Sequence, residues 1–207
     1  MLKIIHPKIW FYKMKGQYKK CSEREIKISK DLTLNKKIIY LESRSFIREA
    51  IGDLYNCSPL DVPLLADPGK PPILLNGLGE ISISHCNDAL IFCLFKDKIG
   101  VDIERTDRQF NYSGIAKRYF YKYKEYDLKR EDVLSDWTII ESAIKWDKGK
   151  LSEDLCFWEI QKEKKIVLNR RKKISVNYNQ FNFIDWTICL AYEEAKLKNN
   201  TICNSII

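Results

Sequence analysis

Hydrophobic residues recur along the chain with two different periods, which separate expected helices from expected strands. In residues 41–55, four apolar side chains follow the i, i+3, i+4, i+7 spacing of one helical face: Ile47, Ala50, Ile51 and Leu54. This pattern predicts a helix, with Arg44, Arg48 and Glu49 facing water. The next segment, residues 59–72, contains five prolines and a glycine. It is expected to be an ordered loop, because proline cannot continue a helix.

The period changes to two from residue 80 onward. Residues 80–86 alternate apolar and polar side chains, and residues 89–95 form a second apolar run. We expect these runs to be antiparallel neighbours in a meander, with residues 96–98 as the turn to a third run at 99–104. An earlier strand-like stretch lies at residues 2–12.

The second half combines helical and strand-like patterns. Helices are expected over residues 115–120 and 133–146. Four β-rich segments follow: 157–160, 165–168, 174–178 and 183–192. The fold class is therefore predicted to be α+β, with an N-terminal half over residues 1–98 and a C-terminal half over 99–207. Each half would combine helices with an antiparallel sheet.

Composition narrows the class of protein. The 207 residues are 45% hydrophobic, enough for a sizeable core, and 36 Lys and Arg against 28 Asp and Glu give a net charge of +8. This charge favours an anionic partner and leaves nucleic acid, acidic protein and phosphorylated ligand open. No apolar run approaches the ~20 residues of a membrane span, and lysines interrupt the N-terminal apolar stretches. We expect a cytoplasmic protein whose seven cysteines are reduced packing residues.

Two acidic patterns could carry chemistry. In the strand at 99–104, Asp102 and Glu104 would emerge on one face while the isoleucines and valine enter a core. Two adjacent carboxylates repel unless solvent screens them or a cation bridges them, so a solvated outer face is the competing interpretation. Glu141 and Lys145 share one helical face, but Glu before Lys at this spacing is also a common surface pair.

A third group lies in the first half. His85 ends a strand, and a lone histidine there is more often a packing residue than a catalyst. Together with Lys70 and Ser84, however, His85 would suit phosphate oxygens.

Five motifs occur in an order that is similar to one known family, the 4′-phosphopantetheinyl transferases of the surfactin-synthetase-activating, Sfp-like type. The motifs are Gly69-Lys70-Pro71, Ile83-Ser84-His85, IGVDIE at 99–104, IAKRYF at 115–120, and Trp137-x-x-x-Glu141-Ser142-x-x-Lys145. Any one of them would arise by chance, but five in order over about 80 residues are specific.

The resemblance implies a fold of two pseudo-symmetric helix-plus-sheet halves with the active site between them. Asp102, Glu104 and Glu141 would hold Mg²⁺ against the pyrophosphate of coenzyme A. The resemblance also places Arg44, Lys70, Ser84, His85 and Lys145 at coenzyme A, and Asp102, Glu141 and Lys145 in the catalytic site.

The implied reaction is attack by a carrier-protein serine on the β-phosphorus of coenzyme A, which releases adenosine 3′,5′-bisphosphate. The expected partners are an acyl or peptidyl carrier protein and coenzyme A, with no nucleic acid or membrane, and the expected state is a monomer. Carriers of this kind have acidic helices, which suit a basic protein. Candidate carrier contacts form a basic and aromatic cluster: Lys117, Arg118, Tyr119, Tyr121, Lys122 and Tyr123. A solvated helix and loop is the alternative for this cluster.

One position departs from the family pattern. Ile140 stands where the helix motif usually has lysine before Glu141. Either Ile140 packs in the core and other basic residues compensate, or the chain is a degenerate homologue that binds coenzyme A or a carrier without transfer. A basic nucleic-acid-binding module is a further alternative, suggested by the net charge and the basic run 170–173. That run is also typical of a solvated hairpin edge.

Overall fold

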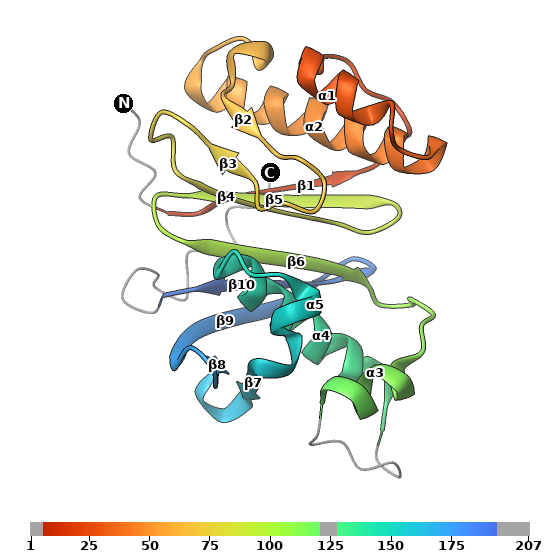
Figure 1. Cartoon of the computed structure of the whole chain (residues 1–207), viewed down its shortest axis with the longest axis vertical. Coiled ribbons are helices and arrows are strands. Elements are labelled where there is room, and N and C mark those ends of the chain that lie inside the picture. The colour runs from red at the N-terminus through yellow and green to blue at the C-terminus, as the bar shows by residue number, and fades with distance from the viewer. Residues whose placement is uncertain (1–5, 121–127, 194–207) are drawn as a thin grey trace. The chain divides into compact units, whose positions relative to one another are not determined.

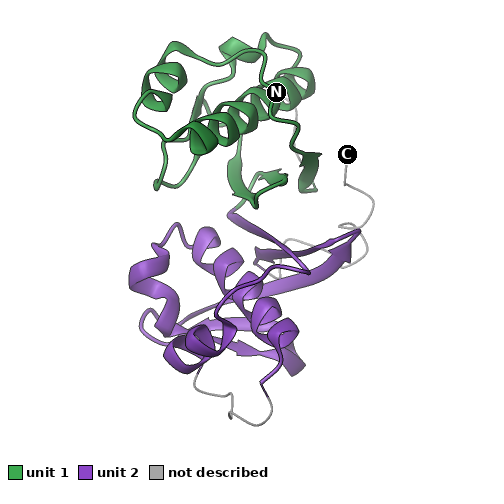
Figure 2. Cartoon of the chain, turned by 90° about the vertical axis from the view of Figure 1, so that its right-hand side faces the viewer, with its two compact units in different colours: residues 1–97, 199–207 green, residues 98–198 purple. Residues whose placement is uncertain are grey.

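The chain forms two compact units in a computed structural model that describes residues 6–120 and 128–193. Among these residues, the first unit comprises 6–97 and the second 98–193 (Figure 2). The division lies one residue from the boundary expected from the sequence. Both units combine helices with antiparallel strands, so the predicted α+β class is confirmed. No helix in the described ranges has the length and apolar character needed to cross a membrane.

The first unit is built on a three-stranded antiparallel sheet. Its strands lie in the order β1 (Lys8–Lys13), β5 (Ala89–Phe95) and β4 (Glu80–His85). Every residue of the central strand β5 is buried. The remaining elements are α1 (Glu23–Ser29), α2 (Leu34–Tyr55), the 3₁₀ turn η1 (Pro59–Asp61), and the short hairpin of β2 (Leu64–Leu65) and β3 (Ile73–Leu74) (Figure 1).

Helix α2 corrects the predicted surface of the first helix. It begins at Leu34, before the expected start, and its Arg44 and Arg48 are buried rather than facing water. The Arg48 guanidinium lies 2.9 Å from the Glu25 carboxylate and donates to the carbonyl oxygens of Val62 and Leu64. The proline-rich segment thus satisfies its backbone with arginines from α2. Helical periodicity along one segment cannot show this, because the partner carbonyls belong to another part of the chain.

The second unit contains a five-stranded antiparallel sheet in the order β6-β10-β9-β8-β7. Its strands are β6 (Ile99–Arg105), β7 (Trp158–Gln161), β8 (Ile166–Asn169), β9 (Ile174–Phe183) and β10 (Trp186–Tyr192). Its helices are α3 (Tyr112–Tyr119), α4 (Arg130–Trp146) and α5 (Leu151–Asp154), with 3₁₀ turns η3 (Leu155–Phe157) and η4 (Lys162–Lys164). Strands β7 to β10 form a meander, as the patterns predicted.

Strand β6 does not continue the first meander. Strand β5 already has β1 on one edge and β4 on the other, so neither edge is available to the third run. Instead β6 pairs with β10, with Asp102 opposite Cys189. The expected antiparallel pairing of the runs at 80–86 and 89–95 is confirmed by β4 and β5. The third run lies outside that meander, because the choice of strand partner depends on distant parts of the chain.

The cysteines in the described ranges differ in exposure, with Cys21 and Cys86 partly buried. Cys93 and Cys189 are buried, as expected for packing residues, and the six cysteines in the described ranges are free thiols. Cys57 and Cys156 are exposed, which contradicts the expectation for them. Cys57 follows the end of α2, and Cys156 lies in the 3₁₀ turn η3, so neither lies in a strand.

Candidate metal centre

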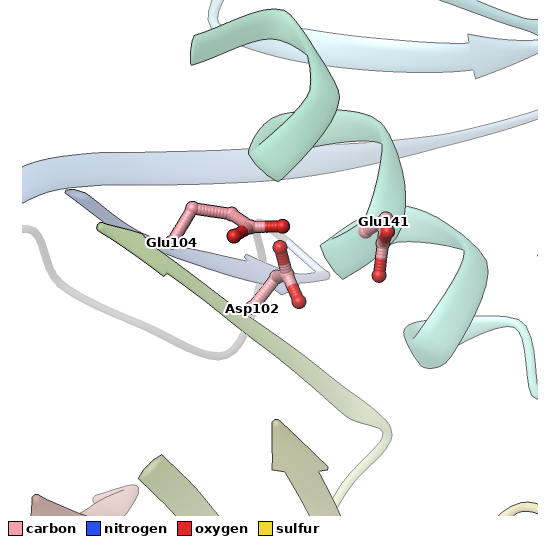
Figure 3. A group of neighbouring side chains, drawn as sticks. All are labelled: Asp102, Glu104 and Glu141. Atoms are coloured by element: carbon pink, nitrogen blue, oxygen red, sulfur yellow. The ribbon is translucent and has the colours of Figure 1, made fainter. Parts of the chain in front are cut away.

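The acidic residues meet where helix α4 crosses strand β6. Asp102 and Glu104 lie on the same side of β6, because side chains two residues apart share a face. Figure 3 shows both side chains extending toward the helix that carries Glu141. One ligand oxygen from each of the three carboxylates lies within 4.8 Å of the others.

Gly100 explains how the helix comes so close to the strand. A Cβ atom at this position would lie only 2.0 Å from the carbonyl oxygen of Ser142 and 2.6 Å from the backbone nitrogen of Trp146. Only glycine therefore permits this contact. Ser142, beside Glu141, is fully buried, and its hydroxyl donates to the carbonyl of Ile139.

The centre formed by Asp102, Glu104 and Glu141 is largely buried. This burial contradicts both a solvated strand face and a surface ion pair. Asp102 is 2% exposed and Glu104 8%. They do not form a solvated outer face, because α4 covers that side of β6. Glu141 and Lys145 are not a free surface pair either, since their side chains are only 17% and 29% exposed.

In the described part of the chain, the side chains of Lys145 and Arg108 form ion pairs with the three carboxylates. The Lys145 ammonium lies 2.6 Å from Oδ1 of Asp102 and 3.6 Å from Oε2 of Glu141. The Arg108 guanidinium forms an ion pair with Glu104. Sequence reasoning missed Arg108, whose position depends on the turn after β6, where its backbone N–H donates to the carbonyl of Arg105. The spacing of four residues between Glu104 and Arg108 indicates an ion pair only when the chain is known to turn after β6.

Burial and mutual repulsion shift the protonation of the centre. Burial raises the pKa of Glu104 to about 7, and the nearby charge of Asp102 adds to this effect. The pKa of Glu141 is raised to about 8, again by burial and then by Asp102. For Lys145, burial lowers the pKa, but the attraction of Asp102 and Glu141 outweighs it and the net pKa is raised.

These residues fit a hard divalent cation. Mg²⁺ is typically held by carboxylate oxygens together with substrate phosphates and water. The raised pKa values of Glu104 and Glu141 indicate that the nearby cations of the chain do not fully neutralise the negative charge of the three carboxylates. A divalent cation would relieve their repulsion, so Asp102, Glu104 and Glu141 are suitable ligands.

The other predicted site residues belong to the first unit. Lys70 is exposed in the loop between β2 and β3, with its ammonium 3.6 Å from Asp67. Ser84 is buried on β4, and His85 is exposed at the end of that strand. Contacts of these residues with coenzyme A stay predictions.

Arg44 has an internal structural position. Its guanidinium donates to the carbonyl oxygen of Ala66 and to the hydroxyl of Ser43, and it lies 4.7 Å from the ring centroid of Tyr40. These contacts account for its burial within the first unit. The burial of Arg44 is therefore explained without a nucleotide, and its contact with the nucleotide stays a prediction.

Ile140 is 2% exposed and packs in the hydrophobic core of the second unit. This agrees with the interpretation that Ile140 is a core residue. It also lines a small cavity of about 120 Å³ together with Phe120 and Trp158. Asp136, Glu159 and Arg170 also line this cavity, so its surroundings are mixed rather than apolar.

The predicted carrier contacts are only partly described. Lys117 and Arg118 are exposed near the end of α3, and the Arg118 guanidinium lies 5.2 Å from the ring centroid of Tyr119. The other three members, Tyr121, Lys122 and Tyr123, lie outside the described residues.

Part of the basic run near residue 170 is neutralised within the chain. Arg170 lies 2.6 Å from Glu159, and Lys172 pairs with Asp147. This pairing reduces the free positive charge that a nucleic-acid-binding module would use there.

Comparison with known proteins adds no relative: no protein-family model matches the sequence, and no curated protein matches it.

Proposed function

We propose that this protein is a magnesium-dependent 4′-phosphopantetheinyl transferase that modifies an acyl or peptidyl carrier protein. The observation that carries the proposal is the convergence of Asp102, Glu104 and Glu141 within 4.8 Å, with Lys145 bonded to Asp102. The two motifs that supply these residues are separated by more than 30 positions in the sequence, yet they meet at one point. A solvated strand and a surface helix would have no reason to meet in this way.

The two units support the corresponding fold as part of the same proposal. Each has an antiparallel sheet and one long helix, α2 of 22 residues in the first and α4 of 17 residues in the second. This repetition is expected of a protein with two pseudo-symmetric halves.

Within the proposed reaction, the carrier serine oxygen forms a bond to the β-phosphorus of coenzyme A as the pyrophosphate P–O bond breaks. The leaving group, adenosine 3′,5′-bisphosphate, takes the electron pair of that bond. Asp102, Glu104 and Glu141 would hold Mg²⁺, which supplies charge neutralisation at the pyrophosphate when bound. Lys145 adds a fixed positive charge beside these residues, and such preorganised charges are the main source of catalysis in phosphoryl transfer.

Glu141 is the candidate acceptor of the serine proton. The pKa of about 8 belongs to the metal-free protein, and a bound cation would lower it, so the position of Glu141 supports this role rather than its pKa. Glu141 is partly accessible, with 17% of its side chain exposed, whereas Asp102 is nearly enclosed. The net charge of +8 would favour encounter with an acidic carrier protein.

The test is intact-mass spectrometry of an apo acyl carrier protein incubated with this protein, coenzyme A and Mg²⁺. We expect a gain of one phosphopantetheine that EDTA abolishes. Asp102→Asn and Glu141→Gln should abolish the gain while circular dichroism stays unchanged. Asp107→Asn is the matched control, because Asp107 is exposed and pairs with Arg105 in the turn after β6.

Other outcomes would separate the alternatives. Full transfer by Glu141→Gln would refute the metal assignment. If no apo acyl or peptidyl carrier gains mass while calorimetry shows coenzyme A binding, the chain is a degenerate homologue. Salt-sensitive nucleic-acid binding without coenzyme A binding would favour the basic module instead.

A further inference from the structure

Arg108 contacts the centre but belongs neither to the motifs nor to the proposed reaction. It lies four residues after Glu104, beyond the end of β6, and its guanidinium forms an ion pair with the Glu104 carboxylate. The Arg108 side chain is 41% exposed, whereas that of Glu104 is only 10% exposed. Arg108 thus connects a buried carboxylate to solvent.

The second arginine of this turn has a different place. Arg105 bonds to Asp107 at 2.7 and 2.9 Å, and both partners are in contact with solvent. Arg108 instead forms its ion pair with Glu104. Arg105 can therefore serve as a matched control for Arg108, because both arginines lie near the same turn but only the pair of Arg108 involves a carboxylate of the centre.

The charges at the centre change sign when a divalent cation enters. Fully ionised, the three carboxylates carry three negative charges, and Lys145 and Arg108 return two positive ones. A divalent cation would leave a surplus of one positive charge. Arg108 then no longer has a carboxylate to neutralise, because Glu104 would be shared with the metal.

We propose that Arg108 is a phosphate-binding residue that rests on Glu104 until a divalent cation takes this carboxylate, and then binds an oxygen of the coenzyme A diphosphate. The inference rests on the proposed function. The planar guanidinium has paired N–H donors that match phosphate oxygens as well as carboxylate oxygens. The exposed part of the side chain gives it room to exchange one anion for the other.

Two titrations of the full chain test this exchange. The first is calorimetry with Mg²⁺ alone, and the second is calorimetry with coenzyme A at saturating Mg²⁺. Arg108→Gln should bind Mg²⁺ alone about two- to fivefold more tightly, because a half-exposed competing charge has been removed. The same variant should bind coenzyme A about tenfold to hundredfold more weakly, the usual effect of losing a charged hydrogen bond.

Two further variants keep the test sharp. Arg105→Gln should change neither affinity by more than about twofold, because Arg105 pairs outside the centre. Arg108→Lys retains the charge without the paired donors, so it should leave Mg²⁺ affinity unchanged and lose part of the coenzyme A affinity. Circular dichroism and thermal melting check that each variant is folded.

Opposite shifts for metal and coenzyme A would support the inference. Weaker binding of Mg²⁺ alone by Arg108→Gln would overturn it, since Arg108 would then serve to hold Glu104 as a ligand. Unchanged coenzyme A affinity would overturn it as well, while leaving the proposed function intact. If the unaltered protein binds no Mg²⁺, the proposed function fails and this inference fails with it.

Discussion

Replacement of Gly100 by alanine tests whether the close contact between β6 and α4 determines the geometry of the candidate metal centre. The added Cβ would lie 2.0 Å from the Ser142 carbonyl oxygen, against an ordinary contact of 3.4 Å or more. The obstructing atoms belong to the backbone, so no side chain can rotate away. The helix would have to retreat by more than about 1 Å, which is the kind of overpacking that costs about 1–3 kcal/mol of unfolding free energy.

The same movement would separate the three candidate metal ligands. Glu141 precedes Ser142 on α4, while Asp102 and Glu104 lie on β6, so a retreat of the helix carries one ligand away from the other two. We expect Gly100→Ala to bind Mg²⁺ at least about tenfold more weakly, as found when the support of a metal ligand is lost. Calorimetry measures this affinity, and urea unfolding measures the stability.

Ser142→Ala is the matched control at the same contact. It leaves the backbone in place and removes one buried hydroxyl, which donates to Ile139. It should lower the unfolding free energy by only about 1 kcal/mol and leave Mg²⁺ affinity within about twofold. If Gly100→Ala keeps both the stability and the Mg²⁺ affinity of the unaltered protein, close approach at Gly100 does not determine the centre.

Three further predictions concern pH, a buried ion pair and the thiols. In the metal-free protein the pKa values of Glu104 and Glu141, about 7 and about 8, lie above the values that these residues have in the unfolded chain. The two protonated glutamates therefore contribute to stability below the ordinary glutamate pKa, and this contribution is lost as the pH rises through about 7 and 8. Thermal melting should therefore show that Mg²⁺ stabilises the protein more at pH 8.5 than at pH 6, and an equal effect would contradict these pKa values. Arg48→Ala should cost about 3–5 kcal/mol in urea unfolding, because it leaves a buried carboxylate uncompensated; a loss below about 1 kcal/mol would be inconsistent with this pair. Burial raises the pKa of the Cys189 thiol, so a thiol reagent should modify exposed Cys156 in the native protein and Cys189 only after unfolding, and reaction at equal rates would contradict the buried position.

Local patterns determined most of the secondary structure. Alternation predicted β4, and the helical repeat predicted the core of α2, because burial of one face imposes a period on the chain. A continuous apolar run predicted β5, which is buried throughout. The same alternation placed Asp102 and Glu104 on one side of β6. The helical repeat placed Glu141 and Lys145 on one face of α4.

Tertiary structure decided what these faces meet. Whether Asp102 and Glu104 face water or a helix depends on α4, which lies more than 20 residues later in the sequence. Likewise, β6 pairs with β10 because both edges of β5 are occupied, and the burial of Arg48 depends on carbonyl groups of a loop. The sequence by itself thus determined which residues share a face. The packing of distant segments decided which faces are buried and which charges meet, because burial and ion pairing arise from contacts that no local period encodes.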